Sequence, residues 1–88
     1  MNVTTLDVET SYHRKYDDTV SSPFEGDILV SVGYKVNDKP CEYLCFNHNH
    51  QKPTKDAKQI LQKVLDETGL LVGHNLKFDY NWLVSCGF

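Results

Sequence analysis

The chain has 88 residues, 40% of them hydrophobic, and a formal net charge of −3. That length allows one small domain, and no run approaches the roughly 18–20 apolar residues of a membrane span. The acidic balance excludes a protein that holds nucleic acid by a basic surface alone, because neutralising phosphates needs clustered Lys and Arg. No basic region followed by an apolar stretch begins the chain, so no signal peptide is expected and a cytoplasmic location is predicted.

A first strand is predicted over residues 3–8, where side chains alternate in character. Its two faces carry Thr4, Leu6 and Val8 on one side and Thr5, Asp7 and Glu9 on the other. Residues 10–24 then turn polar and are expected to form a long loop, of a kind that is often functional or mobile.

The middle of the chain predicts a hairpin followed by a helix. Strands are predicted over 28–36 and 41–46, separated by a turn at 37–40. Thr54 is the predicted N-cap of a helix, and Gly69 suits its C-terminal cap. The helix has an apolar stripe formed by Ala57, Ile60, Leu61, Val64 and Leu65.

The last part predicts one more strand and one more helix. Residues 70–72 form a short apolar run that is typical of a buried parallel strand. Asn75 opens a second helix, which ends near Gly87. The order β-β-β-α-β-α predicts an α/β fold with a mixed sheet, in which the last strand runs parallel to the first.

Two cysteines and two histidines lie close together in the middle of the chain: Cys41, Cys45, His48 and His50. One interpretation is a zinc cluster, although the spacings depart from the usual C-x2-C pairs. The other is that the cysteines share one face of a strand and the histidines lie in the following loop. Cys86 makes the count odd, which argues against a disulfide framework.

The first candidate site is the pair Asp7 and Glu9. Residues separated by one position on a strand point to the same side, with Cα atoms roughly 7 Å apart. Two like charges at that distance repel by roughly 2 kcal/mol at an effective dielectric constant of 20. A hard divalent cation such as Mg²⁺ relieves this repulsion, whereas the alternative is an exposed face of an edge strand.

The second candidate is Asp79, in the first turns of the helix opened by Asn75. That helix follows the carboxyl end of the predicted strand 70–72, and sites in open α/β sheets form at this edge. If the two strands are parallel, Asp79 comes close to Asp7. The alternative is an acidic residue that interacts favourably with the helix dipole.

The two segments resemble the first and second motifs of the DEDD exonuclease superfamily, which has a ribonuclease-H-like fold. Asp7-Val8-Glu9-Thr10 is similar to the first motif, and the run from Gly73 to Asp79, with Trp82-Leu83 after it, is similar to the second. The likeness is greatest to the proofreading 3′–5′ exonuclease domain of family-A DNA polymerases, especially those of bacteriophages. It implies hydrolysis of phosphodiester bonds at the 3′ end of single-stranded DNA.

The resemblance also implies a role for each matching residue. Asp7 would bridge two metal ions, Mg²⁺ or Mn²⁺, while Glu9 would bind the ion that activates the attacking water. Asp79 would hold the second ion, partly through water. Thr10, Asn75 and Phe78 would contact the substrate. Such ions would also supply the positive charge that this acidic chain lacks.

One departure from the family pattern is large. The family has a third motif, in which an Asp follows a Tyr or His, and no such motif lies between Asp79 and Phe88. His74 is expected to support the loop rather than take that role. Residues 1–88 are therefore expected to be the N-terminal part of a single exonuclease domain, lacking its last strand and helices. The partners expected are the rest of that domain and a polymerase domain, in the cytoplasm of a bacterial host if the protein is phage-encoded.

Three alternatives remain open at this point. The first is an RNA 3′–5′ exonuclease of the same superfamily. The second is a non-catalytic remnant that binds nucleic acid without turnover. The third is an unrelated small α/β interaction module, which two motifs in the right order on the right elements disfavour.

Overall fold

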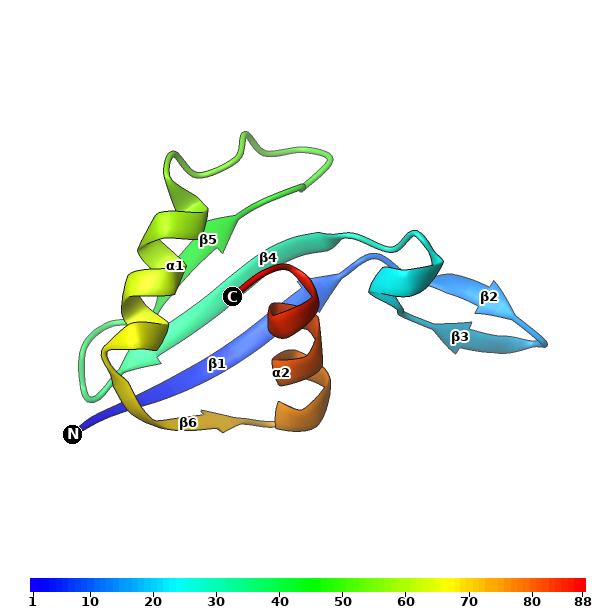
Figure 1. Cartoon of the computed structure of the whole chain (residues 1–88). Helices are drawn as coiled ribbons and strands as arrows, with labels where there is room; N and C mark the ends of the chain where they lie inside the picture. The colour runs from blue at the N-terminus through cyan, green and yellow to red at the C-terminus, as the bar shows by residue number, and fades with distance from the viewer.

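A computed structural model describes all 88 residues. Its centre is a four-stranded sheet in the order β5-β4-β1-β6 (Figure 1). The central strand β1 pairs antiparallel with β4 and parallel with β6, so the predicted mixed α/β sheet is confirmed. The elements of this sheet are β1 (Asn2–Thr10), β4 (Leu29–Val36), β5 (Glu42–Cys45), α1 (Ala57–Asp66), β6 (Thr68–Gly73) and α2 (Leu76–Ser85).

The core lies between one face of the sheet and the two helices (Figure 1). Thr4, Leu6 and Val8 of β1 are buried there, whereas the side chains that alternate with them are exposed, so the predicted division into two faces is confirmed. Leu61 of α1 and Trp82 of α2 close this core from the helix side, at 0% and 2% exposure. Burying one side chain of this size contributes roughly 1.5–3 kcal/mol. The opposite face of the sheet has no helix over it.

Residues 10–24, predicted to be a loop, contain a second sheet. β2 (His13–Lys15) and β3 (Asp18–Val20) form a hairpin that projects from the body of the molecule (Figure 1), and the short 3₁₀ helix η1 (Pro23–Glu25) follows. Tyr16 and Asp17 at its tip both have positive φ, 52° and 64°. Two such residues make the kind of turn that matches the twist of paired strands. The hairpin was not predicted because its residues are mostly polar and lack the apolar alternation of a strand that packs on a core.

Two predicted helix caps are wrong. The N-cap of α1 is Asp56, because the Thr54 hydroxyl instead accepts a hydrogen bond from the backbone N–H of Cys45, at 2.9 Å. Gly69 lies within β6, and the C-cap of α1 is Glu67 instead. In both cases a contact with the sheet took the residue away from the role that local sequence suggested.

The strand β6 is parallel to β1, as predicted, but it is not buried. It lies at the edge of the sheet, and Leu70 and Val72 on its uncovered face are 49% and 41% exposed. Its Leu71 packs against the core on the other face. Neither α1 nor α2 has the length and hydropathy needed to cross a membrane.

Candidate active site

The carboxyl end of β1 extends past its parallel neighbour. The pairing of β1 with β6 ends at Leu6 and Gly73, whereas the pairing with β4 continues to Thr10. Asp7 and Glu9 are therefore held on one side by β4 and have no strand on the other. The chain turns there into α2, which begins at Leu76. The first turns of α2 fill the space that β6 leaves.

Asp79 lies in that space and is 3% exposed. Burial raises the pKa of its carboxyl, the negative charge of Asp7 raises it further, and a hydrogen bond from the backbone N–H of Val8 opposes both. The interaction between the two carboxylates means that Asp7 and Asp79 lie near each other, although they are far apart in the sequence. A buried carboxylate beside a second negative charge is a group that a cation would stabilise.

Gly73 allows this close approach. A Cβ atom at this position would lie 3.1 Å from Asp79 Oδ2 and 3.2 Å from the carbonyl oxygen of Leu6. Both distances are shorter than ordinary van der Waals contact, so any larger residue would push α2 away from β1. Gly73, the first residue of the second motif, is therefore explained by the close packing of Asp79 against β1.

Glu9 is exposed on the uncovered face of the sheet and is turned towards β4. Ser31 Oγ donates a hydrogen bond to Glu9 Oε2 at 3.3 Å, and Tyr43 Oη donates to Ser31 Oγ at 2.7 Å. No three Asp, Glu, His or Cys side chains lie close enough together to hold one metal ion. The structure therefore brings Asp7 and Asp79 together, while Glu9 lies beside them and is bonded to Ser31.

The three predicted substrate contacts have different surroundings. Thr10 Oγ1 is hydrogen-bonded to Ser21 Oγ at 2.5 Å, so it joins the end of β1 to the base of the projecting β2–β3 hairpin, called the arm below. Phe78 is half-buried and packs near Trp82, with ring centres 6.4 Å apart. Asn75 is exposed at the start of α2, and its side chain makes no capping hydrogen bond. Of the three, Asn75 has the side chain most available to a ligand.

The donor atoms suit a hard divalent cation. Carboxylate oxygens are the ligands that Mg²⁺ and Mn²⁺ prefer, and one or two carboxylates with water and phosphate are enough for Mg²⁺. Asp7 and Asp79 provide two such groups at one end of β1. Glu9 accepts its hydrogen bond at Oε2, so Oε1 is the oxygen that it could offer.

A shallow pocket of about 320 Å³ borders Asp7 on the uncovered face of the sheet. Gly33 forms its floor, because it has no side chain opposite Asp7 in the register of β1 and β4. The Tyr43 ring lies 3.9 Å from where a Cβ of Gly33 would be. Lys35 also lines the pocket and is a cation beside the carboxylate.

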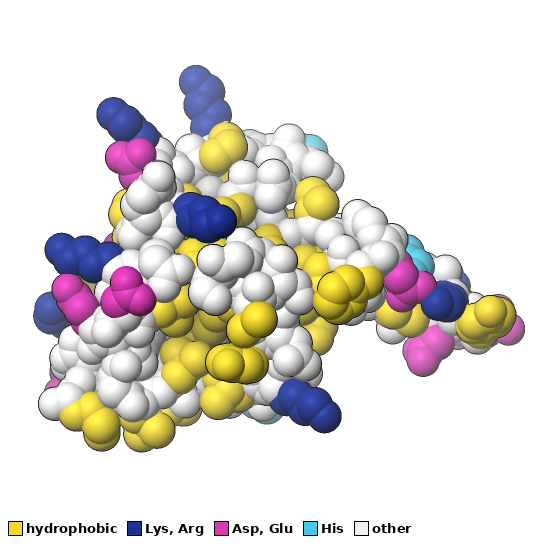
Figure 2. Space-filling model, viewed as in Figure 1, with side chains coloured by type: hydrophobic (Ala, Val, Ile, Leu, Met, Phe, Trp, Pro, Cys, Tyr) yellow, Lys and Arg dark blue, Asp and Glu magenta, His cyan; other side chains and the backbone are white.

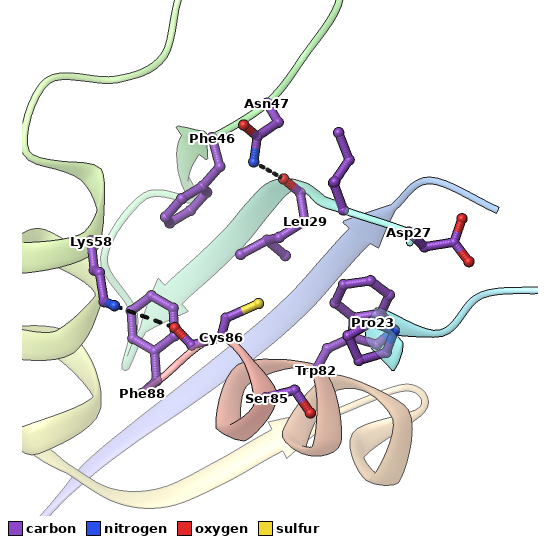
Figure 3. Close-up of a pocket in the computed structure, with 11 residues that line it drawn as sticks. Pro23, Asp27, Leu29, Phe46, Asn47, Lys58, Trp82, Ser85, Cys86 and Phe88 are labelled. Carbon is purple, nitrogen blue, oxygen red and sulfur yellow. Dashed lines mark hydrogen bonds between the residues drawn. The ribbon is translucent and has the colours of Figure 1, made fainter. Parts of the chain in front are cut away.

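A second pocket, of about 370 Å³, lies away from these carboxylates, between α2, the first residue of β4 and the loop after β5 (Figure 3). Phe46, Trp82 and Phe88 supply its aromatic surface, and Lys58 Nζ lies 5.6 Å from the centre of the Phe88 ring. Lys58 Nζ also donates a hydrogen bond to the carbonyl oxygen of Cys86 at 3.3 Å. No carboxylate of the two sequence motifs lines this pocket, so it is separate from the predicted metal site.

Ser31 and Tyr43 were not predicted from the sequence as site residues. One signal was present: Ser31 is a small polar residue within an apolar strand, at a position that shares a face with Glu9 in an antiparallel pair. No protein-family model, curated protein or solved structure matches this chain. Any assignment of function therefore depends on the residues and geometry described above.

Proposed function

We propose that this chain forms part of a metal-dependent 3′–5′ exonuclease domain of the proofreading type, acting on the 3′ end of single-stranded DNA. The observation that carries the proposal is the pair of Asp7 and Asp79. Asp79 is nearly fully buried, and its pKa is raised by burial and by Asp7. A buried carboxylate whose pKa is raised by a neighbouring carboxylate, at the end of a central strand, is a candidate for a functional site.

The fold supports the proposal at a second level. In a ribonuclease-H-like sheet, a central first strand has an antiparallel hairpin on one side and a parallel strand on the other. The order β5-β4-β1-β6, with α1 joining β5 to β6 and α2 following β6, is compatible with that pattern. The remaining strand and helices of such a domain, and a polymerase domain, are the proposed partners.

The proposed roles follow from the positions of the side chains. Asp7 and Asp79 hold the divalent ions, and Glu9 contributes through Oε1. When bound, such ions would stabilise the attacking and leaving oxygens of an in-line displacement. Asn75 orients the terminal nucleotide from the start of α2, while Thr10 and Phe78 shape the surface next to it.

The charge distribution is compatible with dependence on metal. On the face seen in Figure 2, Lys and Arg side chains are scattered, several of them next to acidic ones, with no basic patch. Lys35 is the one cationic side chain that lines the pocket beside Asp7. Cations must therefore neutralise the carboxylates before an anionic substrate can approach.

The test is the melting temperature of the intact chain with and without Mg²⁺ or Mn²⁺. A ligand that binds only the folded state stabilises it by about 2.7 kcal/mol at a hundred times its Kd. The wild-type Tm should therefore rise with metal, and Asp7→Ala should abolish the rise. Asp38→Ala, at an exposed turn position, is the matched control and should keep it. A wild-type Tm that does not respond to either ion contradicts the proposal.

A non-catalytic nucleic-acid-binding role is the second candidate. It is favoured by one observation, the absence of three convergent ligands in the arrangement of Glu9, Asp7 and Asp79. End-labelled DNA and RNA oligonucleotides in Mn²⁺ separate the two functions. Shortening from the 3′ end supports the exonuclease and identifies its substrate, whereas binding without shortening that is unchanged by Asp7→Ala and by removal of Mn²⁺ supports the second role.

A further inference from the structure

Three neighbouring strands contribute to a line of hydrogen bonds on the uncovered face of the sheet. Tyr43 of β5 donates from Oη to Ser31 Oγ at 2.7 Å, and Ser31 of β4 donates from Oγ to Glu9 Oε2 of β1 at 3.3 Å. Ser31 lies directly opposite Glu9 in the register of β1 and β4. Tyr43 pairs with Gly33 and so reaches Ser31 along the diagonal, a distance that a long side chain can span.

The hydroxyl of Ser31 is the link that both other residues need. Ser31 is 0% exposed, and β4 is otherwise apolar around it, with buried Leu29 and Val32 on either side. A buried hydroxyl costs free energy unless it is hydrogen-bonded. Because its oxygen accepts from Tyr43, its single proton is directed to Glu9. The two bonds therefore have one direction, from the phenol to the carboxylate.

We propose that Tyr43 and Ser31 are positioning residues for the Glu9 carboxylate. Together they hold Oε2, which leaves Oε1 as the oxygen available to a divalent ion. This inference rests on the proposed function, in which Glu9 is a ligand. Outer partners that orient a ligating carboxylate typically change metal affinity by about 10- to 100-fold when they are removed.

A purely structural role for Tyr43 can be separated from positioning. Its ring packs beside Gly33 and remains 51% exposed, so Tyr43→Phe keeps the packing and removes only the hydroxyl. Such a change should leave the fold and the metal-free Tm close to those of the wild type. Ser31→Ala also removes the bond to Glu9, but at a fully buried position.

The experiment is calorimetric titration of the intact chain with Mn²⁺. Ser31→Ala should weaken binding by about tenfold and Tyr43→Phe by about threefold or more, in line with outer-shell effects on other sites. Glu9→Gln should weaken it most, and adding Tyr43→Phe to Glu9→Gln should cause no further loss, since the effect passes through Glu9. Tyr80→Phe, at a 58% exposed position on α2, is the control and should bind as the wild type does.

The outcomes separate this inference from the proposed function. If Asp7→Ala loses Mn²⁺ affinity but Tyr43→Phe does not, the metal site stands and the positioning role is overturned. Additive losses in the Tyr43→Phe/Glu9→Gln chain also overturn it, because they show a route that bypasses Glu9. A wild-type chain that binds no Mn²⁺ overturns both. If Ser31→Ala fails to fold, the Mn²⁺ affinity of Tyr43→Phe, a change at an exposed position, still tests the positioning role.

Discussion

Two nearly buried carboxylates lie in different regions of this molecule, and their pKa values are shifted in opposite directions. Asp27, at the base of the hairpin arm, has a side chain that is 7% exposed, and Asp79 at the end of β1 is 3% exposed. A backbone hydrogen bond from Ser22 lowers the pKa of Asp27, with smaller contributions from His13 and Ser11, and burial opposes them. Burial and Asp7 instead raise the pKa of Asp79.

The difference comes from the groups around each carboxylate. Asp27 accepts hydrogen bonds from the Ser22 backbone N–H and His13 Nδ1 at 2.8 Å each, and from Ser11 Oγ at 3.1 Å. Asp79 has one backbone donor and a neighbouring negative charge. Burial alone therefore does not identify a functional carboxylate. Asp27 is satisfied within the protein, whereas Asp79 retains an interaction that a cation could complete.

The largest effect is expected from Asp27→Ala. This change leaves three partly buried donors, on Ser11, His13 and Ser22, without their acceptor, and the loss of such hydrogen bonds destabilises the fold. We expect Tm to fall by several degrees, more than for any other single change considered in this comparison. Thermal unfolding followed by circular dichroism measures it, with Asp38→Ala as an exposed control. An unchanged Tm would contradict the claim that the hydrogen bonds of Asp27 stabilise the base of the arm.

A smaller effect of opposite sign is expected from Asp79→Asn. In metal-free buffer the amide avoids the repulsion from Asp7 and can still accept from Val8 N–H. We expect a gain on the order of 1 kcal/mol, or about 4–8 °C in Tm for a chain of this size. In Mg²⁺ the same variant should lose the metal-dependent rise. A fall in metal-free Tm would mean that the charge on Asp79 stabilises the fold.

The pH dependence of stability should separate the two carboxylates further. The pKa of Asp27 is lowered in the folded chain, so its stabilisation is present above the ordinary Asp value of about 3.9 and is lost as pH falls through the folded value. The pKa of Asp79 is raised, so its protonated form stabilises below about 3.9, and this is lost as pH rises through the folded value. Unfolding curves between pH 3 and 8 should lose the first effect in Asp27→Asn and the second in Asp79→Asn. Curves of unchanged shape would contradict the assignment.

The smallest effect is expected from His13→Gln. The His13 ring is 32% exposed, and the largest cause of the low Asp27 pKa is the Ser22 backbone rather than the histidine. Partly exposed ion pairs contribute little to stability, because solvent screens the charges. Chemical denaturation of the wild type and the variant resolves such a difference. A loss as large as that of Asp27→Ala would show that His13, and not the backbone, holds the arm.

Local pattern in the sequence determined the faces of β1. Alternation alone predicted that Leu6 and Val8 share one face and Asp7 and Glu9 the other, because side chains of a strand alternate whatever it pairs with. The positions of Asn75 and Asp79 at the start of the last helix were also predicted correctly. Each of these properties depends on neighbours within a few residues.

Only the tertiary structure decided what surrounds those carboxylates. Asp79 meets Asp7 because β6 stops at Gly73 while β1 continues, and Glu9 meets Ser31 because β1 and β4 pair in one particular register. The caps at Thr54 and Gly69 were wrong for a related reason, since contacts with the sheet outweighed the local preference of each residue. Strand ends and registers are set by packing between distant segments, and so the sequence predicted Asp79 near Asp7 from the parallel strands but not the hydrogen bond of Glu9 to Ser31.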